Sequence, residues 1–82
     1  MNYQSSYARI EKVRDDLYHF VVQDRFRQID ELIDDPKLLA MLAKESPLAE
    51  NGEPISAAEI VSRLDNAKVG DVMTISLVER VA

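Results

Sequence analysis

Apolar residues recur through the first third of the chain at intervals of three or four, the spacing of one face of an amphipathic helix. This spacing predicts helices over residues 6–22 and 24–34, with a break near Gln23 and Asp24, where the aspartate can cap the second helix. The two apolar stripes consist of Tyr7, Ile10, Val13, Leu17 and Phe20 or Val21, and of Phe26, Ile29, Leu32 and Ile33.

An N-terminal β-hairpin is the alternative interpretation of the same segment. Residues 17–22, Leu-Tyr-His-Phe-Val-Val, form an aromatic and β-branched run of the kind that favours strands. In this alternative they pair with residues 8–13 across the turn at 14–16. That turn contains neither glycine nor asparagine, and residues 8–13 do not alternate cleanly between apolar and polar. We therefore favour the helices.

Residues 34–80 contain clearer sequence signals of secondary structure. An aspartate pair followed by Pro36 predicts the start of a helix over residues 36–45, and Ser56 with Glu59 forms a capping box for a helix over residues 57–67. Turn-forming residues fill the segment between these two helices. After Gly70, the apolar residues Met73, Ile75 and Leu77 alternate with polar residues, and this pattern predicts a half-buried strand over residues 71–80.

These elements predict a single domain, residues 1–82, of the α+β class. It is mainly helical, with about four short helices and a C-terminal strand. A lone strand leaves backbone N–H and C=O groups without partners, so the strand is expected to pair across a dimer or with the edge of a partner. In the alternative, the hairpin (8–13, 17–22) accepts residues 71–80 as a third strand of an intrachain sheet.

Composition and charge limit the partners and the cellular compartment expected for this domain. Ten basic and fifteen acidic residues give a net charge of −5, which disfavours binding to a phosphate backbone, and acidic residues interleave the arginines of the first third. No apolar run approaches the roughly 20 residues of a membrane span, so no membrane association is expected. The chain has no cysteine, which suits a reducing compartment, and the cytoplasm is the expected location.

Candidate chemistry is sparse. His19 is the only histidine, and on a helix Asp15 could orient its imidazole, but no nucleophile with a recognisable motif accompanies them. The acidic pairs lack the spacing of a calcium loop, and neither Gly52 nor Gly70 belongs to a phosphate-binding motif. We therefore expect no enzyme activity, no catalytic residue, no metal and no cofactor.

The expected function is binding to another protein. A small acidic domain with a strand that needs a partner is typical of a non-catalytic interaction, regulatory or inhibitor protein, and we expect it to form a homodimer. The residues expected at the protein interface are Met73, Ile75, Leu77, Tyr7 and Tyr18. The alternative is a DNA-binding regulator of the helix-turn-helix type, in which residues 55–81 would supply the two helices.

Overall fold

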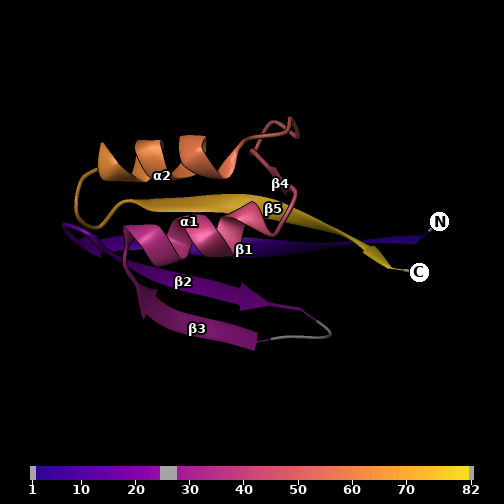
Figure 1. Cartoon of the computed structure of the whole chain (residues 1–82), viewed down its shortest axis with the longest axis horizontal. Coiled ribbons are helices and arrows are strands. Elements are labelled where there is room, and N and C mark those ends of the chain that lie inside the picture. Colours follow the sequence, from indigo (N-terminus) through magenta and orange to yellow (C-terminus); the bar gives the residue numbers. More distant parts are fainter. Residues whose placement is uncertain (1, 25–27, 82) are drawn as a thin grey trace.

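The computed structural model describes residues 2–24 and 28–81, and of residues 2–5 and 78–81 it describes the backbone alone. Five strands and two helices follow one another along these residues (Figure 1). The elements are β1 (Asn2–Arg14), β2 (Leu17–Gln23), β3 (Gln28–Ile33), α1 (Asp35–Ala43), β4 (Pro47–Leu48), α2 (Ala57–Asp65) and β5 (Val72–Val81).

The strands form one sheet in the order β3-β2-β1-β5-β4, and every neighbouring pair is antiparallel. β1 is the longest strand, with 13 residues, and it lies at the centre. It pairs with β2 from Ala8 onward and with β5 from Asn2 to Glu11. The first and last strands of the chain are therefore neighbours, and they hold the sheet together through long-range pairing.

The expectation of a mainly helical domain with four short helices is wrong. The segment expected to be helical from residue 6 to residue 34 instead carries β1, β2 and β3, and the described residues contain two helices. The hairpin alternative is present as β1 and β2, although it included neither β3 nor β4. The helices expected over 36–45 and 57–67 are present as α1 and α2, within two residues of the expected bounds. Phe26 of the second stripe lies outside the described residues.

The C-terminal strand finds its neighbours within the chain. β5 lies between β1 and β4, so the expected pairing of this strand across a dimer or with a partner's edge is wrong. The helix-turn-helix alternative required a second helix in this segment. Residues 72–81 form a strand instead.

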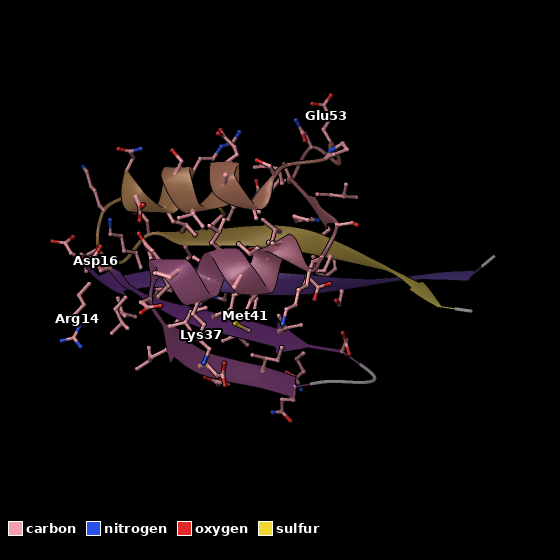
Figure 2. All side chains as sticks on the ribbon, viewed as in Figure 1. Arg14, Asp16, Lys37, Met41 and Glu53 are labelled. Carbon is pink, nitrogen blue, oxygen red and sulfur yellow. The ribbon has the colours of Figure 1, made fainter. Side chains whose placement is uncertain are left out.

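Both helices pack on one face of the sheet (Figure 1). Each starts at the expected cap: Asp34 accepts the N–H of Lys37 at 3.1 Å, and Ser56 accepts the N–H of Glu59 at 3.1 Å. Met41 of α1 points toward β2 and packs against the core between them (Figure 2). The buried core consists of Ala8, Ile10, Tyr18, Phe20, Val22, Ile33, Leu38, Leu42, Ile55, Ile60, Leu64, Ile75 and Leu77.

The molecule is elongated because β1 and β5 run on beyond the helices. Its extents are 40 × 24 × 19 Å, and at about 3.3 Å per residue the 13 residues of β1 span the whole long axis. Residues 2–6 of β1 and 77–81 of β5 form this extension, here called the terminal arm, and the paired residues Asn2 and Val81 lie at its tip (Figure 1). α1 and α2 have nine residues each, too few for a membrane span.

Candidate protein-interaction surface

The helices leave one face of the sheet uncovered, here called the open face. Side chains alternate between the two faces of a strand, and residues paired across strands share a face. The inward positions of β1 and β2, such as Ile10 and Phe20, are buried beneath the helices, so the intervening positions form the open face. Its residues include Tyr7, Arg9, Glu11, His19, Val21, Asp30, Leu32, Val72 and Thr74.

Three large apolar side chains on the open face are exposed to solvent. Tyr7 is 65 % exposed, Leu32 62 % and Val72 46 %, whereas the inward residues next to Tyr7 and Leu32 in sequence, Ala8 and Ile33, are at most 2 % exposed. The three are not contiguous, since His19 and Glu11 lie between Leu32 and Val72, but all three are exposed on one sheet face that no described helix covers, and an exposed apolar surface marks a candidate site for another protein. The open face is therefore the candidate functional site.

Charged side chains on the open face form pairs with one another. Arg9 and Glu11 form an ion pair at 3.3 Å, and Nε2 of His19 lies 2.5 Å from Oδ1 of Asp30. His19 and Glu11 are paired in register and lie between Leu32 on one side and the Val72 position on the other. Paired charges lose less on desolvation than isolated charges, so a partner could cover the Arg9–Glu11 pair at a reduced cost, and the Asp30 carboxylate would keep its hydrogen-bond partner His19.

His19 does not take the partner expected from the sequence. Its strand conformation removes the helical spacing that would have brought Asp15 to its imidazole, and Asp15 lies in the turn before β2. Asp30 of β3 is its hydrogen-bond partner instead, and this carboxylate is two-thirds exposed. Within the described residues, no three acidic or histidine side chains come together as a possible metal site. The His19–Asp30 pair thus joins two neighbouring strands at the surface.

Lys12 occupies an inward position at the opposite, helix-covered face. It is 4 % exposed, and its ammonium group donates to three backbone carbonyls at the C-terminal end of α2: Leu64 at 3.2 Å, Asp65 at 3.0 Å and Ala67 at 3.1 Å. The last carbonyls of a helix carry the negative end of its dipole, and of these three the Leu64 carbonyl also accepts the N–H of Ala67. Lys12 therefore fixes α2 on the sheet, and its role is structural.

A second polar cluster lies beside Lys12, where Tyr18 meets both helices. The hydroxyl of Tyr18 donates to Oδ1 of Asp65 at 2.5 Å. Burial and then this hydrogen bond raise the pKa of Tyr18 above its ordinary value. Burial and the nearby carboxyl of Asp65 raise the pKa of Asp35, whose Oδ1 is buried without a hydrogen-bond donor. Two carboxyl groups in this position repel each other when both are ionised.

The five residues expected at an interface lie in different places. Ile75 and Leu77 are each 1 % exposed and fill the core, and Tyr18 is fully buried beneath the helices. Met73 is half-buried at the edge of β5, and Tyr7 lies on the open face. The structure therefore places Tyr7 on the same sheet face as residues that were not predicted at an interface, chiefly Leu32 and Val72.

A shallow groove continues the open face around the edge of β5. It encloses about 390 Å³ and is lined by Ala49, Glu50, Asn51, Arg63, Val72, Met73 and Thr74. Nε of Arg63 donates to Glu59 at 3.0 Å, so this cation is already paired. Because Val72 and Thr74 belong to both surfaces, the groove extends the area that a partner could contact.

Comparison with protein-family models, with curated proteins and with solved structures finds no match to this chain.

Proposed function

We propose that this protein acts without catalysis, by binding another protein through the open face, as a regulatory or inhibitor protein. The observation that carries the proposal is the exposure of Tyr7, Leu32 and Val72 on a sheet face that no other described element covers. Aromatic and aliphatic groups at the centre of an interface supply most of its binding energy when water is excluded from them.

The size and charge of the molecule suit such a role. A standard protein interface buries about 800 Å² on each partner, which is roughly one-seventh of the 5372 Å² accessible on this chain. A sheet face can supply an area of this order. The net charge of −5 favours encounter with a basic protein, because complementary charge speeds association.

Self-association belongs to the same proposal. A chain that exposes apolar groups on one face and unpaired strand edges at one end has two surfaces for assembly, and we propose that two copies form a dimer. Because the chain has no cysteine, we place this activity in a reducing compartment, the cytoplasm.

Matched charge substitutions on the two sides of the sheet test partner binding. Leu32→Lys puts a charge on the open face, and Leu39→Lys puts the same charge on the outer side of α1, where Leu39 is 41 % exposed. Tagged proteins expressed in their native cells are captured, and the co-purifying proteins are compared after circular dichroism has confirmed folding. We expect specific partners to be retained by L39K and lost from L32K. Equal retention by both variants, or loss from L39K alone, would contradict the open face as the binding site.

A further inference from the structure

The terminal arm has a strand edge with no neighbour among the described residues. β2 pairs with β1 from Ala8 onward, whereas β5 pairs with β1 from Asn2. Along residues 2–6, β1 therefore has β5 on one side and no described strand on the other. Alternate residues of a strand direct their N–H and C=O groups to opposite sides, so part of this backbone is available to pair with another strand.

The edges formed by β3 and β4 differ from this one, and on the arm itself the outer edge of β5 beyond Leu77 includes the charged residues Glu79 and Arg80. β3 is short, and Asp30 and Glu31 place acidic residues along it. At the opposite edge, β4 is followed by a loop that bridges back to it at Leu48 and Pro54. Charge, short length and covering loops are the features that keep strand edges from pairing with other chains. Residues 2–6, Asn-Tyr-Gln-Ser-Ser, carry no charge, proline or glycine.

We propose that residues 2–6 of β1 pair with the same residues of a second copy, antiparallel and across a two-fold axis, so that two sheets become one. This inference rests on the self-association proposed above and identifies the surface that performs it. Antiparallel pairing of identical strands is self-complementary, so it closes as a dimer and leaves no growing end.

Charge supports a second copy as the occupant of this edge. Two chains that each carry −5 repel one another, and the repulsion is least where the contacting segment is uncharged. The β1 edge of the terminal arm meets this condition, and the arm projects beyond the helices (Figure 1). On the neighbouring strand, Glu79 pairs with Gln4 and is followed by the oppositely charged Arg80. A pairing of about five residues per copy is short, so the dimer is expected to be weak and to form at high micromolar concentration.

Paired charge substitutions on the arm test the inference. The variant Gln4→Lys/Ser5→Lys places like charges opposite one another in the proposed dimer, and Gln4→Glu/Ser5→Glu does the same with the opposite sign. Sedimentation velocity should show that each variant alone raises the dimer dissociation constant at least about tenfold relative to wild type, a loss of about 1.4 kcal/mol. An equimolar mixture should recover dimers that contain one copy of each. Ala40→Lys, an exposed change on α1 away from both the arm and the open face, serves as the control and should leave the dimer intact.

Recovery in the mixture cannot result from misfolding, since two unfolded variants would not restore each other. Hydrogen exchange adds a positional readout: amides of residues 2–6 should gain protection as wild-type concentration rises, and those of 28–33 should not. A wild-type chain that remains a monomer, variants that dimerise as wild type does, or protection gained at 28–33 would each overturn the inference. The outcome of these experiments is independent of the partner-capture experiment, because L32K alters the open face and leaves the arm unchanged.

Discussion

Lys12 joins the sheet to the end of α2 through a single ammonium group. Its three hydrogen bonds go to carbonyls at the C-terminal end of the helix, where the regular helical pairing ends. We expect Lys12→Met to lower the free energy of unfolding by about 2 kcal/mol, since hydrogen bonds to a charged donor are among the stronger ones and the freed carbonyls stay largely buried. Urea denaturation measures this loss.

The matched control for that substitution is Lys37→Met. Lys37 lies exposed on α1, pointing toward β3, and its ammonium is 3.8 Å from Glu31 (Figure 2). An exposed pair of this kind contributes little, so the change should stay within about 0.5 kcal/mol. Equal losses from the two variants would show that the carbonyl contacts of Lys12 do not stabilise the fold.

Asp35 gives the fold an unusual dependence on pH. Burial and the carboxyl of Asp65 raise the pKa of Asp35 in the folded state. A carboxyl whose pKa is raised on folding favours the folded state below its unfolded pKa, near 4, and loses that contribution as pH rises through the folded pKa. Ionised Asp35 therefore costs stability at neutral pH.

Asp35→Asn tests this effect by removing the charge and retaining the shape. We expect the variant to melt at a higher temperature than wild type at pH 7, and the difference to shrink as pH falls toward 4. Asp15→Asn, which removes one charge from the exposed turn, serves as the control in the same thermal scans. A difference between D35N and wild type that grows on acidification would have the wrong sign and would contradict the carboxyl pair.

At the scale of elements, two local features explain why the sequence did not favour the hairpin of β1 and β2. Inward positions of β1 include the polar residues Ser6 and Lys12, both buried, while the open face carries Tyr7. Because both faces of the strand mix polar and apolar residues, the alternation expected of a half-buried strand is weak. α1 and α2 could be predicted because their caps and proline act locally.

The turn of the hairpin is the second feature. Asp16 adopts φ = 64° and thereby takes the left-handed conformation for which glycine or asparagine was expected. Asp16 and Arg14 both lie at this end of the sheet (Figure 2). We expect Asp16→Val to lower the free energy of unfolding by about 1–2 kcal/mol, because a β-branched residue is strained at positive φ.

The same substitution one residue earlier provides the control. Asp15→Val removes the same charge and adds the same side chain at a position without positive φ. Guanidinium denaturation of the two variants should differ by about 1 kcal/mol or more. If both variants lost the same stability, the left-handed conformation of Asp16 would not limit the hairpin.

At the scale of the whole molecule, the site could not be predicted because it depends on long-range pairing. The open face combines residues from β1, β2, β3 and β5, and the whole of residues 15–71 separates β1 from β5 along the chain. Tyr7 was identified from its size alone. Leu32 and Val72 became visible as surface residues only once the register placed them opposite the helices.

The central claim is that the open face of the sheet contacts a protein partner. Site-specific photo-crosslinking in the native cells tests it most directly, with a photoreactive phenylalanine analogue placed at Tyr7 or at Leu32 and, as the control, at Leu39 on the helix side. Both open-face positions should yield the same discrete adducts to another protein, and position 39 should yield none of them. Adducts from position 39 alone, or none from positions 7 and 32 in a folded and expressed protein, would contradict the claim.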